Sequence, residues 1–192
     1  MNSEILRGVT VATLALAAGM TVGCSSLSAR GPGLVPVSQV EPPRDSADAV
    51  VVMVRASQVG DTYAFPIEDE QGEILAYSTA HAQFALHLEP GARSLSLRAH
   101  GYVDVLSAEL AAGRTYYVSI ELRPTPAGLK WTLVPLRKDD LGSKAVQEAL
   151  KATPAFRVDR DLAKHSPPRS GELVSTLAPT VGSHTLRIDD GQ

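Results

Sequence analysis

The side chain with the most distinctive chemistry is Cys24, because it is the only cysteine in the 192-residue chain. A lone cysteine forms no intramolecular disulfide and builds no cysteine-based zinc site. Its thiol lies directly after an apolar stretch, residues 9–22, and directly before the polar pair Ser25-Ser26. In an exported protein a free thiol would be open to oxidation. We therefore expect Cys24 to be covalently modified.

The segment before Cys24 has the features of an export signal. Arg7 supplies a short basic region, and an apolar run of roughly 14 residues follows it. A bilayer-spanning helix needs about 20 apolar residues, so this run is short for a permanent anchor. Thr21-Val22-Gly23-Cys24 resembles the bacterial lipobox, in which Leu usually stands where this chain has Thr21. Two alternatives stay open: a secreted protein with an unmodified cysteine, and an uncleaved membrane anchor.

The lipobox resemblance implies a lipoprotein. Residues 1–23 would be a removed signal peptide, and Cys24 would carry a diacylglycerol and become an acylated N-terminus. Several acyl chains are needed, because a single myristoyl-length chain binds a membrane only marginally. Residues 24–47 are rich in Ser, Gly and Pro, which predicts a flexible tether reaching roughly 25 Å. Ser25 resembles the sorting signal for the outer membrane, so we expect lipid anchoring at the periplasmic face of the cell outer membrane.

Other side chains capable of chemistry form no recognisable site. The five histidines are scattered along the chain: His81, His87, His100, His165 and His184. Should the strands on either side of Pro90 form a tight hairpin, His81 would lie opposite His100, but a zinc site normally needs three or four ligands. We therefore expect no metal site.

Catalytic and cofactor motifs are also missing from the sequence. It has no Gly-x-Ser-x-Gly elbow, no P-loop and no dinucleotide-binding fingerprint. The acidic pairs Asp69-Glu70 and Asp139-Asp140 read as turns or caps, because neighbours on a strand point to opposite faces. We therefore predict a protein that is not an enzyme and has no cofactor. A hydrolase with an unrecognised site is the weaker alternative.

The charge pattern argues against a nucleic-acid partner. The formal net charge is -3 and the sequence pI is about 5.9. A surface that binds phosphates needs clustered Lys and Arg. The longest run of basic residues is the pair Arg137-Lys138.

The elements that must position any site are β-strands, in residues 48–137. Strand-like alternation and turn signals recur every 8 to 12 residues or so, which predicts an all-β domain, an antiparallel β-sandwich of about seven or eight strands. In residues 83–88 and 94–99 the apolar positions alternate on both sides of Glu89-Pro90-Gly91. This pattern predicts a hairpin with Phe84 opposite Leu97.

Two segments of this region resemble a known family. The stretches FALHLEPGARSLSLRA and LAAGRTYYVSIEL look like the small β-sandwich domains of unknown function in bacterial lipoproteins, which are related to the PEGA type. The residues that carry the resemblance are Gly91, Gly113, Tyr116, Tyr117 and Val118. It implies an exported, non-enzymatic β-sandwich, and it implies no particular ligand.

The C-terminal part is expected to be less ordered. Residues 138–153 predict a short amphipathic helix that ends at Thr153-Pro154, either packed on the sandwich or presented to a partner. The Pro, Ser and Gly content of residues 154–192 predicts a largely disordered, irregular tail. Within it, residues 184–188 are a candidate short strand.

The features above together predict a protein that binds a partner rather than one that catalyses a reaction. The sequence is typical of a lipid-anchored cell-envelope protein whose β-sandwich is a non-catalytic binding or structural module, held to the membrane by its lipid and facing another envelope protein or cell-wall glycan. The alternative is a carbohydrate- or peptidoglycan-binding module that uses Tyr117. Trp131 alternates in phase with Leu129 and Leu133, so we expect it in the core rather than on a sugar platform.

Overall fold

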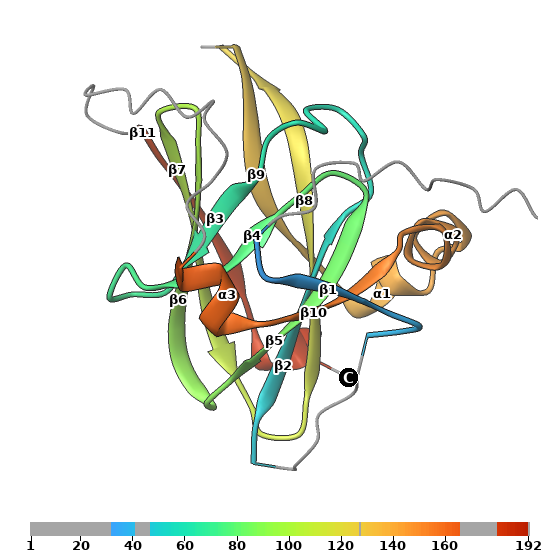
Figure 1. The fold of residues 1–192 in the computed structure, drawn as a ribbon. Coiled ribbons are helices and arrows are strands. Elements are labelled where there is room, and N and C mark those ends of the chain that lie inside the picture. Colours follow the sequence, from blue (N-terminus) through green and yellow to red (C-terminus); the bar gives the residue numbers. More distant parts are fainter. Residues whose placement is uncertain (1–31, 41–46, 127, 166–179, 192) are drawn as a thin grey trace, which may run out of the picture.

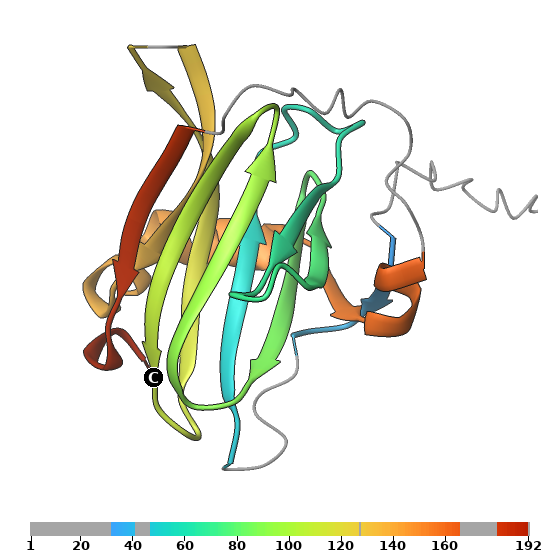
Figure 2. The ribbon, with the colours of Figure 1, turned by 90° about the vertical axis from the view of Figure 1, so that its left-hand side faces the viewer.

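The structure, a computed structural model, describes residues 32–40, 47–126, 128–165 and 180–191. Two β-sheets lie face to face, and helices lie outside them (Figures 1 and 2). One sheet has six strands, in the order β1 (Leu34–Val37), β10 (Ala155–Val158), β5 (Ala82–Leu88), β2 (Ala49–Arg55), β8 (Thr115–Thr125) and β9 (Gly128–Leu136). The other has five, in the order β11 (Thr180–Leu186), β7 (Tyr102–Leu110), β6 (Gly91–Ala99), β3 (Phe65–Glu68) and β4 (Ile74–Ser78).

Both sheets are mixed. Three pairs of neighbouring strands run parallel: β10 with β5, β2 with β8, and β11 with β7. The β-rich class predicted from the sequence is confirmed, but the purely antiparallel arrangement of seven or eight strands was wrong. An alternating pattern fixes which face of a strand is buried. It does not fix the direction of the neighbouring strand, so the parallel pairs left no sign in the sequence.

The space between the sheets is filled by the predicted apolar faces. Every described strand with clear alternation buries the side that the sequence indicated, including Phe84, Leu86, Leu95, Leu97, Tyr116, Val118, Ile120, Trp131 and Leu133. Trp131 is therefore a core residue, as expected. On β7, Val103 and Val105 share one face, and the opposite face, with Leu106 and Leu110, is the one buried in the core.

The predicted hairpin around Pro90 was wrong. Strand β5 pairs with β2 and β10 in the six-stranded sheet, whereas β6 pairs with β7 and β3 in the five-stranded sheet. The turn at Glu89-Pro90 therefore crosses from one sheet to the other. Two facing strands of different sheets bury alternate residues in the same core, just as two partners in one hairpin do. His81 and His100 accordingly are not cross-strand partners.

The helical region lies where it was predicted, with a break. Helix α1 (Lys138–Leu141) ends at Gly142, and Ser143 begins α2 (Lys144–Ala152) by accepting a hydrogen bond from the amide of Val146 at 3.3 Å. Helix α2 covers the outer face of the six-stranded sheet, where half-buried Leu150 contacts the valines of β2. This cover explains why all seven residues of β2 are buried.

The expectation of an irregular tail over residues 154–192 needs correction. Its described parts contain β10, α3 (Arg160–His165), β11 and a 3₁₀ helix (Ile188–Asp190). These strands are short or polar, and they owe their place to pairing with β5 and β7 rather than to a local pattern. The predicted tether, residues 24–47, likewise contains β1, which pairs with β10.

The predicted signal peptide, residues 1–23, and Cys24 lie outside the described residues. Within the described ranges, no helix has the length and apolar character needed to cross a membrane.

Candidate binding groove on the six-stranded sheet

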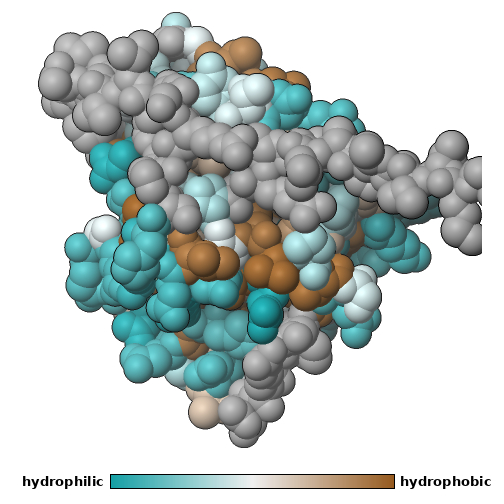
Figure 3. All heavy atoms as spheres, viewed as in Figure 1, coloured by the Kyte–Doolittle hydropathy of each residue, from teal (hydrophilic) through white to brown (hydrophobic). Residues whose placement is uncertain are grey.

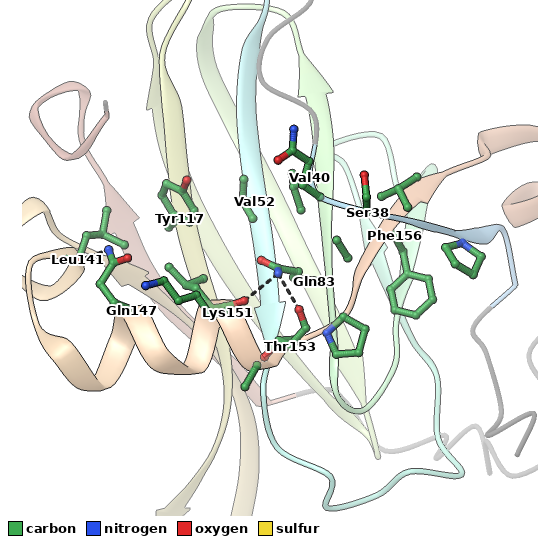
Figure 4. A pocket seen from close by; sticks show the side chains of 17 residues that line it. Ser38, Val40, Val52, Gln83, Tyr117, Leu141, Gln147, Lys151, Thr153 and Phe156 are labelled. Carbon is green, nitrogen blue, oxygen red and sulfur yellow. Dashed lines mark hydrogen bonds between the residues drawn. The ribbon is translucent and has the colours of Figure 1, made fainter. Parts of the chain in front are cut away.

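A groove of about 740 Å³ lies on the outer face of the six-stranded sheet (Figure 4). Its floor is formed by Val52 of β2 and Tyr117 of β8. Helix α2 forms one wall, and the chain from β1 to Val40 forms the other together with Phe156 of β10. Figure 3 shows hydrophobic residues at the surface in the middle of the molecular face that carries β1 and β10.

Gln83 of β5 fixes the position of α2 beside the sheet. Its side-chain amide donates to the carbonyl oxygens of Leu150 and Thr153, at 2.9 Å and 2.7 Å. These carbonyls belong to the C-terminal end of the helix, where main-chain acceptors lack partners within the helix. The sequence placed Gln83 on the outward face of its strand, and the structure confirms this. Its partners, about 70 residues further along the chain, left no local signal.

The groove combines an apolar floor with polar walls. Val40, Leu150 and Tyr117 pack against the outer valines of β2. Gln147 and Lys151 project from α2, and Ser38 and Gln39 lie along the opposite wall. Lys151 is the single charged side chain among the described residues that line the groove, and none of them is a carboxylate or a histidine. Such a lining suits a neutral or anionic ligand held by hydrogen bonds and apolar contact.

Tyr117 is the predicted site residue that the groove contains. Strand alternation placed its ring on the outer face, and the structure confirms a half-buried position there. Tyr116, its neighbour, is fully buried in the core, where its hydroxyl accepts a hydrogen bond from the amide of Ala111 at 2.9 Å. Lys151 and Gln147 were predicted on the polar face of the helix. Phe156 was missed, because it lies in the segment expected to be irregular.

The histidines do not converge. His81 and His100 occupy turns with φ of 51° and 47°, and His100 packs its ring edge-on against Tyr63 and Phe65. In the part of the chain that the structure describes, no group of three or more His, Cys, Asp or Glu side chains is placed to hold a metal ion.

One histidine does meet a carboxylate. Nε2 of His184 in β11 lies 3.5 Å from Oδ2 of Asp104 in β7. Asp104 is buried, and the same oxygen accepts a hydrogen bond of 2.7 Å from the amide of Leu133 on the edge strand β9. The carboxylate thus joins β9 of one sheet to β7 and β11 of the other. These contacts hold the two sheets together along the side of the domain where β9, β7 and β11 lie.

The acidic pairs are turns and caps, as predicted. Oδ1 of Asp69 accepts hydrogen bonds from the amides of Gln71 and Glu73, at 2.9 Å and 2.8 Å. Oδ2 of Asp140 accepts from the amide of Arg137 at 2.9 Å, at the start of α1.

Arg55, at the end of β2, is fully buried, and no pattern in the sequence predicted this. Its guanidinium lies 4.2 Å from the ring centre of Trp131 and 4.8 Å from that of Phe65. Burial lowers the pKa of Arg55 to about 10, although Asp61 acts in the opposite direction. The side chain is therefore charged at neutral pH.

Comparison with known proteins adds no relative. No family model matches the chain, and neither a curated protein nor a solved structure matches it. The resemblance to PEGA-type lipoprotein domains therefore stays a prediction.

Proposed function

We propose that this chain is a lipid-anchored cell-envelope protein, attached through Cys24 at the periplasmic face of the outer membrane, whose two-sheet domain is a non-catalytic binding module. The groove between α2 and the six-stranded sheet is its binding surface. The observation that carries the binding role is the lining of that groove: apolar valines and Tyr117 below, amides and Lys151 above. It offers contacts for recognition without the paired acid and base that hydrolysis needs.

The anchor is tested by replacing the thiol. The Cys24→Ala variant is expected to lose lipid labelling and to leave the membrane fraction, because no acyl chain can be attached. Its control is Ser26→Ala, which leaves the cysteine in place. Unchanged fractionation of Cys24→Ala would refute the lipid anchor.

The groove is tested by site-specific photo-cross-linking in intact cells. A photoreactive residue in place of Lys151 should capture a defined partner, because its side chain lies at the groove. The matched control is the same residue in place of Arg123, an exposed position on the β8–β9 hairpin. The adduct at position 151 should disappear when Tyr117→Ala is added. The same adducts from both positions would rule out the groove as the specific surface.

The second candidate is a carbohydrate- or peptidoglycan-binding module. The observation that favours it is the half-exposed ring of Tyr117 on the groove floor, because an aromatic side chain offers a sugar a flat apolar face with a polar hydroxyl at its end. Calorimetry with soluble peptidoglycan fragments tests this candidate. Binding by the wild type that weakens at least tenfold, about 1.4 kcal/mol, in Tyr117→Ala would support it. No heat of binding in the wild type would leave a protein partner as the ligand.

A further inference from the structure

The folded domain begins much closer to Cys24 than the sequence predicted. Gly33 is already fixed: its carbonyl oxygen accepts a hydrogen bond from the amide of Asp159 at 2.8 Å, and its φ is 77°. A Cβ at this position would lie 2.6 Å from the carbonyl oxygen of Asp159 and 2.8 Å from the amide nitrogen of Ala163. The chain therefore enters the domain beside α3, and β1 follows immediately.

The length of chain between Cys24 and Gly33 limits how the domain can be oriented. Nine residue steps span at most about 32 Å, whatever conformation they take. A domain of about 150 residues has a radius of gyration of about 15 Å and a diameter of about 40 Å. If α3 lay on the far side from the membrane, Gly33 would be out of reach of the anchor. The side of the domain that carries α3 therefore faces the bilayer or lies beside it, and does not point directly away from it, provided that Cys24 is lipidated as proposed.

The surface of α3 suits that position. Leu162 is 52% exposed, although Ala163 beside it is fully buried against the domain. Exposed Arg160 and Lys164 lie on either side of Leu162 in sequence. Arg160 donates to the carbonyl oxygen of His87 at 2.7 Å, and Lys164 pairs with Glu73.

Long basic side chains lie close to Leu162 in sequence. Residues 155–165 contain three basic side chains, Arg157, Arg160 and Lys164, and two acidic ones, Asp159 and Asp161, while Glu73 pairs with Lys164. An exposed leucine among long basic side chains is the arrangement that settles at a lipid headgroup boundary. The leucine enters the apolar edge while the cations stay with the phosphates.

We propose that α3 is the membrane-contacting surface of this protein, with Leu162 inserted at the headgroup boundary of the phospholipid bilayer that holds the acyl chains of Cys24. This inference rests on the proposed lipidation. The tip of the β8–β9 hairpin lies on the opposite side of the domain from α3 in Figure 2. Leu129, at the start of β9, is 64% exposed.

Leu129 provides a matched control for a depth measurement. The lipidated protein is purified from membranes as Leu162→Cys or Leu129→Cys, labelled on the introduced thiol with a fluorophore, and placed in phosphatidylethanolamine–phosphatidylglycerol vesicles that contain nitroxide-labelled phospholipid. Both positions are exposed, so both variants should fold, and their thermal unfolding checks this. We expect the fluorophore at position 162 to be quenched at least threefold more than the one at position 129.

The outcomes separate this inference from the proposed function. Equal quenching at the two positions in a lipidated protein would overturn the membrane contact of α3 and leave the anchor intact. A free Cys24 thiol, or protein that does not remain with the vesicles, would overturn the anchor and this inference with it.

Discussion

At the scale of single residues, Arg55 is the side chain on which one end of the core depends. Its guanidinium donates to main-chain carbonyl oxygens of the loop after β2 and of β4, those of Val59, Gly60, Tyr63 and Ser78, over 2.8 to 3.3 Å. Arg55→Met keeps an apolar contact with Trp131 but removes every donor. We expect a loss of roughly 3 kcal/mol in the free energy of unfolding, measured by urea titration, because the buried carbonyl of Ser78 and part-buried carbonyls of the loop lose their donor.

The control for this variant is an arginine at the surface. Arg123 pairs with Glu121 at 2.8 Å on the β8–β9 hairpin, and both side chains are well exposed. Arg123→Met should change stability by less than about 0.5 kcal/mol. Equal effects of the two substitutions would show that the contacts of Arg55 do not stabilise the core.

Leu86 tests the inward face that was read from the sequence. Its side chain is 1% exposed at the centre of the space between the sheets. Leu86→Asp places a charge there, and we expect the domain to lose its cooperative thermal transition in circular dichroism. Ser107→Asp, an exposed position on β7, should melt as the wild type does. A cooperative wild-type transition in Leu86→Asp would mean that the assigned core face is incorrect.

At the scale of elements, Gln83 connects α2 to the sheet. Gln83→Ala removes both hydrogen bonds to the C-terminal end of the helix. We expect faster amide hydrogen exchange across α2 and a loss of about 1–3 kcal/mol in stability, with exchange in β6 and β7 unchanged. Thr132→Ala is a control on β9, because it removes a hydrogen bond that lies on a different strand. Unchanged exchange in α2 would show that packing alone holds the helix.

An ion pair connects helix α3 to the start of β4: Lys164 of α3 pairs with Glu73, the residue before β4. Lys164 lowers the pKa of the Glu73 carboxyl below its ordinary value of 4.5, first by hydrogen bonding and then by its charge. A carboxyl with a lowered folded-state pKa stabilises the fold above the unfolded-state pKa, and this contribution disappears as pH falls through the lowered value. We expect the Tm difference between wild type and Glu73→Gln to persist down to about pH 4.5 and to vanish below it. Because the pair is exposed, the difference should be small and salt-sensitive.

The control for this pH dependence removes the other partner. Lys164→Met should produce the same profile, because either substitution breaks the same pair. A Tm difference that does not change with pH would contradict a role for the ionised Glu73.

The sequence predicted the positions of the strands better than it predicted which strands pair with one another. Alternation identified the buried faces of β5, β6, β8 and β9 because burial acts on each strand separately. It could not show that the turn at Pro90 crosses between sheets, since both arrangements bury Phe84 and Leu97. Strand β10 was missed, and only the end of β11 was anticipated, as a short strand at residues 184–188, because both strands depend on pairing with β5 and β7.

For the groove, too, the sequence predicted local features but not the contacts between distant segments. Tyr117, Gln147 and Lys151 were assigned to the correct faces of a strand and a helix, because local periodicity sets those faces. Their approach to one another was not predictable, because it depends on Gln83 binding the end of α2 and on β1 and β10 extending the sheet. Arg55 was not recognised as a core residue, because a cation at the end of an apolar strand reads as its exposed terminus.

At the scale of the whole molecule, the proposed anchor and the observed fold together limit how the domain can be oriented on the membrane. The chain enters the domain at Gly33, beside α3, a short distance from Cys24 in sequence. The groove lies on the outer face of the six-stranded sheet, bordered by β1 and α2. A binding module on so short a tether would meet its ligand close to the membrane. The distance is limited by the tether, at most about 32 Å, and by the width of the domain.

The most direct test of this account is the intact mass of the mature protein extracted from the membrane fraction. The account predicts a chain that begins at Cys24 and carries a diacylglycerol on its sulfur and a further acyl group on its new N-terminus. A mature chain that begins at any other residue, or one in which Cys24 carries a bare sulfhydryl, would contradict it.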